Sequence, residues 1–277
     1  MKKMTILYKI SFSALFIALG VILSRFFALP YLFGLPFLKI SLAVSVILFS
    51  SFYLGPLFGT IVGFSVDFFG AILFPQGGSY DPLYSIPALL EGLAPCLIYL
   101  AITKLKLDKK KPILLGILIL LFNIIVLVFV LTHDTFSYTA TSKKYEFTPF
   151  LKAFIPSLFV VLGILFLIAI IVLKNKFANK KLNQYYNIYA IASSVFLTYF
   201  LIKIPISSLI FMYRLEYTYE IIFGVRSLTG FLTCLVHTFM CLLALDVSLK
   251  AGTKGYLVKE LVLENRTEEE VKNESKN

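Results

Sequence analysis

The segment that decides the fold is GPLFGTIVGFSVDFFGAILFPQGGSYDP, residues 55–82. It begins with the breaker pair Gly55-Pro56, continues through an apolar run that carries one acid, Asp67, and ends in a glycine-containing loop rimmed by aromatic residues. Within the longer stretch 41–103 it is the polar hairpin between apolar helices. An acid inside a membrane segment indicates a functional site. The segment therefore predicts a place where a small molecule is held at a membrane surface.

The composition makes a lipid bilayer the solvent of this chain. Of its 277 residues, 59% are hydrophobic and 15% are charged, and the mean hydropathy is +0.89. A water-soluble globule of this length cannot hide so many apolar side chains. Apolar runs of roughly 20 residues cross a bilayer as helices, because every backbone polar group there must be paired internally. We expect an all-α integral membrane protein with helices at residues 8–28, 41–54, 57–74, 85–103, 112–131, 150–173, 186–211 and 221–249.

The breakers and the tail set the domain organisation. The second helix is short and ends at Gly55-Pro56, which predicts a close hairpin with the third helix. We interpret residues 1–249 as a single transmembrane domain and residues 250–277, which mix Lys and Glu, as a partly disordered cytoplasmic tail. The first apolar run has no A-x-A-like cleavage site and is longer than the apolar region of a signal peptide, which favours a retained helix.

The net charge is +11, and the distribution of the basic residues along the chain indicates its orientation in the membrane. The lysines collect in short segments between apolar runs and form no stripe with interleaved aromatic residues, so we expect no nucleic-acid partner. Cytoplasmic segments carry the excess of Lys and Arg. One set of alternate segments carries Lys2, Lys3, Lys9, Lys104, Lys106, Lys109, Lys110, Lys111, Lys174, Lys176, Lys180 and Lys181; the other carries Lys39, Lys143, Lys144, Lys152 and Arg214. This imbalance predicts that both termini are cytoplasmic.

Basic residues toward the outer ends of the spans form a candidate anion site. They are Arg25, Lys39, Lys203, Arg214 and Arg226. A charge near hydrocarbon is costly unless it is paired or reaches the interface. Such a cluster suits a carboxylate, which arginine binds through two parallel hydrogen bonds. For Arg25 we favour ligand binding. For the others, headgroup contact by snorkelling is the simpler interpretation, and Lys39 and Arg226 remain candidate ligand residues.

Two acids lie deep in the apolar pattern, and neither predicts catalysis. Asp67 and Glu91 either pair with basic residues or relay protons; pairing is favoured because no series of acids and histidines follows at helical spacing. Cys234, His237 and Cys241 share one helix face, and three ligands on one straight helix cannot surround a metal ion. The sequence has no nucleophile in a recognisable context and no phosphate loop. We expect no enzyme activity, no cofactor and no metal site.

The N-terminal third is similar to a known family of transport proteins. The residues that carry the resemblance are ALFIALGVILSRF (14–26), LPFLKISLAVSVILFSSFYLGPLFGTIVGFSVDFFGAILFP (35–75) and FPQGGSYDP (74–82). They resemble the substrate-binding (S) component of energy-coupling factor (ECF) vitamin transporters, most closely the folate type. The likeness extends loosely to the last two helices, through Arg226 at the start of the final span.

The resemblance implies a membrane subunit that binds a vitamin from outside and has no energy source of its own. Such a subunit assembles with an ECF transmembrane coupling protein and a pair of ATPases in the plasma membrane of a bacterium. By this analogy the small-xxx-small pair Ala14 and Ala18 docks on the coupling protein, and Arg25 contacts the ligand. The loop that covers the ligand would contain Phe74, Pro75, Gly77, Gly78 and Tyr80.

Two departures from the family pattern matter. S components have six helices, so residues 112–173 are interpreted as an inserted transmembrane hairpin on a six-helix core. After the loop tyrosine, SYDPLYS (79–85) places Asp81 where its charge would repel an anionic vitamin. This second departure makes folate less secure than the transporter class.

The sequence therefore predicts a substrate-binding membrane subunit for a vitamin that carries a carboxylate and an aromatic ring, such as folate. Arg25 would pair with the carboxylate, while Tyr80 and Tyr84 would stack on the ring or seal the loop. Three alternatives stay open. They are a stand-alone ion-coupled carrier that depends on Asp67 or Glu91, a lipid-modifying membrane enzyme, and a non-transporting subunit whose hairpin binds another membrane protein.

Overall fold

The computed structural model describes residues 5–29, 40–75, 80–105, 112–132, 135–137, 144–146, 148–177, 182, 185–215, 218–253 and 255–257. Its long helices are α1 (Ile6–Phe26), α2 (Ala43–Leu54), α3 (Pro56–Leu73), α4 (Ser85–Lys104), α5 (Ile113–Thr132), α6 (Pro149–Phe177), α8 (Ile188–Leu197), α9 (Ile204–Leu215) and α10 (Tyr219–Lys250). A 3₁₀ turn, η2 (Pro82–Tyr84), precedes α4, and a π-helical segment, η3 (Thr198–Lys203), joins α8 to α9.

Strands are confined to two short antiparallel ribbons in the described chain. One pairs β1 (Ala28–Leu29) with β2 (Ile40–Ser41), and the other pairs β3 (Thr135–Ser137) with β4 (Lys144–Glu146). Both connect consecutive helices, from α1 to α2 and from α5 to α6. The expected helices are thus all present, and their ends differ from the expected positions by only a few residues.

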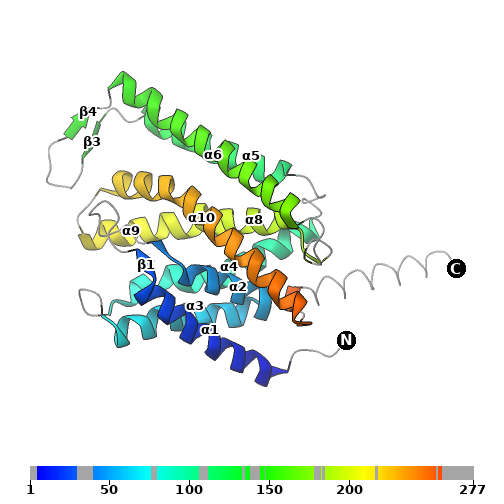
Figure 1. The fold of residues 1–277 in the computed structure, drawn as a ribbon. Coiled ribbons are helices and arrows are strands. Elements are labelled where there is room, and N and C mark those ends of the chain that lie inside the picture. Colours follow the sequence, from blue (N-terminus) through cyan, green and yellow to red (C-terminus); the bar gives the residue numbers. More distant parts are fainter. Residues whose placement is uncertain are drawn as a thin grey trace.

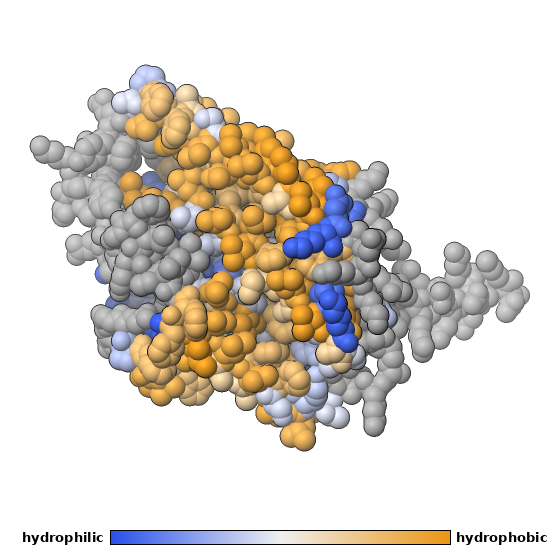
Figure 2. All heavy atoms as spheres, viewed as in Figure 1, coloured by the Kyte–Doolittle hydropathy of each residue, from blue (hydrophilic) through white to orange (hydrophobic). Residues whose placement is uncertain are grey.

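The chain is an all-α integral membrane protein. Seven helical stretches in the described residues are long and apolar enough to cross a bilayer, and α2 is a shorter apolar helix beside them. Large apolar side chains such as Ile124, Ile125 and Val161 are about half exposed. Figure 2 shows apolar residues over most of the visible sides of the bundle, with strongly hydrophilic residues gathered near its right-hand end. Such an apolar exterior is stable only in lipid.

The helices lie side by side with their ends at two faces of the molecule (Figure 1). Helices α1 to α4 form one part of the bundle, α8, α9 and α10 cover it, and the α5–α6 hairpin lies outermost. The start of α1 and the end of α10 share one face, while both ribbons lie at the opposite face. The two faces therefore differ in structure: one holds the start of α1 and the end of α10, and the other holds the ribbons.

Glycines set the close approach of α2, α3 and α4. Gly55 has φ 100°, a conformation that L side chains rarely adopt, and it turns the chain directly from α2 into α3 with Pro56 at the first helical position. This confirms the expected close hairpin. Further along, Gly59 and Gly92 face each other across α3 and α4, and a Cβ on either would overlap the partner's carbonyl oxygen. Small residues let membrane helices meet backbone to backbone in this way.

The α5–α6 hairpin is held by phenylalanines. The Phe122 ring lies 4.5 Å from that of Phe200 and 6.0 Å from that of Phe159, and Phe200 lies 4.9 Å from Phe231. Aromatic pairs at these separations add roughly 0.5–1.5 kcal/mol each beyond their area burial. The hairpin is thus anchored on η3 and α10, away from α1 and α3.

The start of the predicted tail belongs to the fold. Leu257 is fully buried, and the Tyr256 ring packs against Gly55 so closely that a Cβ there would lie 3.1 Å from it. Residues 258–277, which make up the rest of that tail, lie outside the described residues. The apolar pair at 256–257 covers the α2–α3 turn, so the ordered domain extends past residue 249.

Candidate functional site

A cavity of about 320 Å³ lies between six elements near the face that carries the ribbons. Its walls come from the end of α1, the β2–α2 segment, the second half of α3, the η2–α4 segment, the η3–α9 segment and the first half of α10. The α5–α6 hairpin supplies none of the described lining residues. The polar lining residues are Ser24, Arg25, Ser41, Asp67, Tyr84, Glu91, Tyr199, Lys203, Ser207, Arg226, Thr229, Thr233 and His237.

Arg25 is a half-buried cation whose Nε atom has spare hydrogen-bonding capacity. Its guanidinium packs against Gly70 of α3, where a Cβ would lie 2.9 Å from Nε and 3.0 Å from an Nη atom. The Nε atom is buried and has no hydrogen-bond partner among the described residues. Asp67 is the acid whose charge acts on it. Because an unpaired buried donor is costly, this guanidinium is poised to receive an acceptor from outside the protein.

A short hydrogen-bond relay connects Asp67 to the segment after the loop. Ser85 Oγ donates to Asp67 Oδ2 at 2.6 Å, and Tyr80 Oη lies 2.8 Å from Ser85 Oγ. The same segment is tied to α9, since Arg214 lies 2.7 Å from Asp81 Oδ2. Asp81 is therefore paired with Arg214 and does not line the cavity. The structure thus differs from the expectation that the Asp81 charge would face the ligand.

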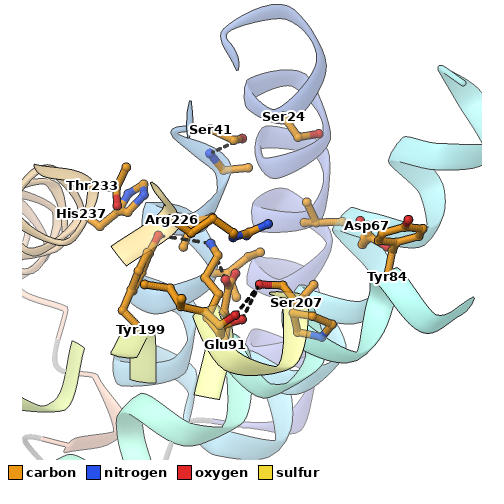
Figure 3. A pocket seen from close by; sticks show the side chains of 18 of the residues that line it. Ser24, Ser41, Asp67, Tyr84, Glu91, Tyr199, Ser207, Arg226, Thr233 and His237 are labelled. Carbon is orange, nitrogen blue, oxygen red and sulfur yellow. Dashed lines mark hydrogen bonds and ion pairs between the residues drawn. The ribbon is translucent and has the colours of Figure 1, made fainter. Parts of the chain in front are cut away.

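A second charged cluster occupies the other side of the cavity. Figure 3 shows Glu91, Tyr199 and Arg226 on one side and Asp67 and Tyr84 on the other. Lys203 Nζ lies 2.5 Å from Glu91 Oε1 and donates to Tyr199 Oη at 3.2 Å. The pair is well buried, with side-chain exposures of 17% and 4%. The expectation that Glu91 pairs with a basic residue is therefore confirmed. The expectation that Lys203 reaches the lipid headgroups is wrong, because its ammonium group is paired with Glu91 inside the protein.

The π-helical segment explains why Lys203 faces inward. Pro205 lacks a backbone N–H and its ring would clash with the carbonyl four residues earlier. The chain widens into η3 just before it, where the Ile204 N–H bonds to Tyr199 O. π-Helical turns of this kind occur frequently at functional sites. Both Tyr199 and Lys203 belong to this segment and both line the cavity.

Histidine and aromatic groups complete the walls. His237 is buried, and its Nδ1 lies 2.7 Å from Ser45 Oγ of α2. His237 therefore has a hydrogen-bond partner within the protein, Ser45. The Cys234–His237–Cys241 pattern on one helix face did not predict this partner. The Arg226 guanidinium stacks over the Phe211 ring at 5.1 Å, and the Phe211 and Tyr84 rings are 5.3 Å apart.

The structure brings together some of the candidate residues and separates others. Arg25, Tyr84 and Arg226 line the cavity. Phe74 and Pro75 are exposed and lie outside its lining, with the Phe74 ring 5.4 Å from that of Phe26. Ligand contact by Tyr80, Phe74 and Pro75 stays a prediction. Lys39, Gly77 and Gly78 lie outside the described residues.

The two alanines of α1 lie on its outer face. Ala14 and Ala18 are both exposed, while Ser13, Phe16, Gly20 and Val21 are buried on the inner face. Gly20 packs so tightly against Val66 that a Cβ there would lie 3.1 Å from Val66 Cγ1 and closer still to Cγ2. The small residues of α1 thus divide into an inner one used within the chain and an outer pair open to another helix.

Sequence reasoning missed polar lining residues contributed by η3, α9 and α10. Tyr199, Ser207 and Thr233 line the cavity without a motif that marks them. The available signal was Pro205, which follows a lysine in an apolar run and disturbs the helix locally. Which side chains that disturbance turns inward depends on the packing of neighbouring helices.

Comparison with known protein families matches residues 8–145 to the ECF transporter substrate-specific component. The matched part contains Arg25, Asp67 and Glu91, whereas Lys203 and Arg226 lie beyond it. Neither the curated proteins nor the solved structures contain a significant match to the chain.

Proposed function

Because the chain belongs to the family of ECF transporter substrate-specific components, we propose that it captures a vitamin at the outer face of a cell membrane. The cargo in this proposal carries a carboxylate and an aromatic ring, as folate and related molecules do. The protein is a substrate-binding membrane subunit, and its family consists of transport components and not of enzymes.

The observation that carries the proposal is the buried Arg25 Nε, which has no hydrogen-bond partner among the described residues and belongs to a side chain that lines a partly open cavity. A carboxylate that bonds Nε and a terminal nitrogen would satisfy the buried donor through two parallel hydrogen bonds. Gly70 leaves the space in which the guanidinium lies flat. Arg226 extends the positive surface toward the second cluster. Both arginines line the same cavity, so an anion bound there would be attracted by both.

The walls suit an aromatic ring of modest size. Tyr84 and Phe211 form one aromatic side and Tyr199 another. Ligand pockets typically span about 300–1,000 Å³, so a cavity of about 320 Å³ is at the small end of that range. Tyr80 is held over the Asp67 side by its contact with Ser85, which supports a loop that closes after the ligand enters.

Energy would come from partner subunits. The sequence has no phosphate loop of the G-x-x-x-x-G-K-[ST] type, so we propose a coupling protein and an ATPase pair as partners. The exposed Ala14 and Ala18 on α1 permit close approach of a partner helix. Lys9 near the start of α1 and Lys174 and Lys176 in the last turn of α6 lie toward the face that holds the start of α1 and the end of α10 (Figure 1), which supports cytoplasmic termini.

The test is ligand-dependent stabilisation of the purified protein. A vitamin that binds the folded state raises its unfolding temperature, by an amount that grows with ligand concentration over Kd. We expect at least one carboxylate-bearing aromatic vitamin to do so, and mass spectrometry to find a co-purifying compound that Arg25→Ala loses. Lys152→Ala is the matched control, because it removes one positive charge from α6, which does not line the cavity. No stabilisation by any vitamin of a broad panel would refute the proposal.

A further inference from the structure

His237 presents one of its two ring nitrogens to the cavity. The residue lies inside α10, its side chain is buried, and it belongs to the cavity lining. Its Nδ1 lies 2.7 Å from Ser45 Oγ, and its Nε2 forms no hydrogen bond with the residues that the structure describes. Nε2 is nevertheless not one of the sealed-off polar atoms that lack a partner. Since His237 lines the cavity, the cavity is the space to which Nε2 is open.

The contact with Ser45 determines which ring nitrogen carries a proton. Ser45 is buried, and its hydroxyl has no other hydrogen-bond partner in the described part of the chain. If the ring had a proton on Nδ1 alone, Nδ1 would donate to Ser45 Oγ, and the buried serine proton would lack an acceptor, which is costly. If Ser45 donates to Nδ1, both groups are satisfied and the ring proton is on Nε2. A doubly protonated ring also carries a proton on Nε2, so this conclusion does not depend on the charge of the ring.

The neighbouring hydroxyls of α10 cannot replace this donor. Thr229 and Thr233 line the same wall of the cavity. Each donates its hydroxyl proton to backbone carbonyls of the preceding helical turn, at 3.0–3.2 Å. Both can therefore offer only oxygen lone pairs to a ligand. On the wall formed by residues 229–237, His237 is the side chain that offers a hydrogen-bond donor.

His237 lies across the cavity from the α3 wall. Figure 3 shows His237 on one side of the cavity and Asp67 on the other. Arg25 belongs to the Asp67 side, because its guanidinium packs against Gly70, which lies about one helical turn after Asp67 on α3. A ligand whose carboxylate pairs with Arg25 would therefore extend its other end toward His237.

We infer that His237 is a specificity-determining residue, whose Nε2–H donates a hydrogen bond to an acceptor on the ligand ring. The acceptor is an exocyclic carbonyl oxygen or an unprotonated ring nitrogen. This inference rests on the proposed function and narrows its cargo class from any aromatic ring to a heterocycle with an acceptor remote from its carboxylate. A ligand without that acceptor would cover the N–H group and leave it unpaired, which lowers its affinity.

The first measurement tests the position of the proton in the ligand-free protein. The chain has two histidines, His133 and His237, so the variant His133→Gln leaves one imidazole to observe. Nitrogen-15 NMR of this full-length variant, labelled at histidine and held in lipid bilayers, distinguishes protonated from unprotonated ring nitrogens. We expect a proton on Nε2. A ring that carries its proton on Nδ1 alone would overturn the inference, whether or not any vitamin binds.

The second measurement tests what the donor recognises. The vitamin that stabilises the protein in the panel is titrated against the unmodified protein and two variants. His237→Phe keeps an aromatic ring without a donor, whereas His237→Gln keeps an N–H group at a similar distance from the backbone. We expect His237→Phe to raise Kd at least about fivefold and His237→Gln to retain most of the affinity. A change in cavity shape alone would weaken binding at least as much in the glutamine variant.

A matched pair of ligands makes the same test without any variant. The binding vitamin is compared with an analogue in which C–H groups replace its ring acceptors; for nicotinate, the analogue is benzoate. We expect the unmodified protein to bind the analogue at least about fivefold more weakly, and His237→Phe to remove most of this preference.

The outcomes separate the inference from the proposed function. Equal Kd values for His237→Phe and the unmodified protein would overturn the inference while leaving vitamin binding intact. Equal binding of the vitamin and its analogue by the unmodified protein would do the same, even if His237→Phe does not fold. Failure of every panel vitamin to bind would refute the proposed function, and with it the ligand contact, even where NMR assigns the proton to Nε2.

Discussion

Replacing Gly92 by alanine should force α3 and α4 apart. An ideal Cβ at this position would overlap the carbonyl oxygen of Gly59 and lie 2.8 Å from the Thr60 amide nitrogen. Both are backbone atoms, so no side chain can rotate away. Overpacking of this kind costs about 3 kcal/mol at the upper end of its usual range, and alanine in a helix recovers about 0.8 kcal/mol. The net loss of stability is about 2 kcal/mol.

This loss can be measured with the protein's own cysteines. Cys96, Cys234 and Cys241 are all buried, so a thiol-reactive fluorophore reports their exposure on unfolding in detergent, and the chain contains no tryptophan for an intrinsic fluorescence assay. A loss of about 2 kcal/mol corresponds to a fall of about 4–8 °C in the unfolding temperature. Gly92→Ala should also weaken ligand binding, because α3 carries Asp67 and α4 carries Glu91.

Gly116→Ala is the matched control for this prediction. A Cβ at Gly116 of α5 would meet only Leu167 Cδ1, at 3.7 Å, which is ordinary contact. This variant gains helix propensity without overlap, so its unfolding temperature should stay the same or rise. If Gly92→Ala unfolds at the same temperature as Gly116→Ala, the backbone contact between α3 and α4 does not hold the helices as argued.

Three further predictions test other parts of the structure. Gly55→Ala should destabilise the fold by about 1–3 kcal/mol, because φ 100° is strained for alanine and the added Cβ would press on Tyr256; an unchanged unfolding temperature would contradict the turn geometry. Ser85→Ala removes the donor to Asp67 and the partner of Tyr80, so ligand affinity should fall about 5–30-fold in a binding titration, whereas Ser85→Thr keeps the hydroxyl and most of the affinity. Phe159→Ala opens a space beside Phe122 and Phe231 and should cost about 3–5 kcal/mol without changing Kd, because α6 does not line the cavity; a parallel loss of affinity would refute that separation.

The α5–α6 hairpin illustrates how function and stability divide in this chain. It was expected as an insertion from its two apolar runs, and the structure attaches it through the Phe122, Phe200 and Phe231 rings. The helices that line the cavity meet each other without it. Its attachment on η3 places it next to the segment that carries Lys203, so the hairpin supports that wall from behind.

The helices and the turn were predictable because their signals are local. Runs of apolar residues long enough to cross a bilayer specify helices wherever they occur, and Gly55-Pro56 specifies a tight break through backbone conformation alone. Arg25 was identifiable for the same reason, since a lone charge near hydrocarbon is costly at any position unless it has a use.

The composition of the cavity was decided only by tertiary structure. Glu91 faces Lys203 because α4 packs against η3, the π-helical segment before Pro205. Asp81 forms an ion pair with Arg214, which is far away in the sequence. Such pairings depend on how each helix is rotated about its axis and how closely it approaches its neighbours. A one-dimensional pattern specifies which residues lie in the membrane, but the charge that a ligand meets is set by long-range packing.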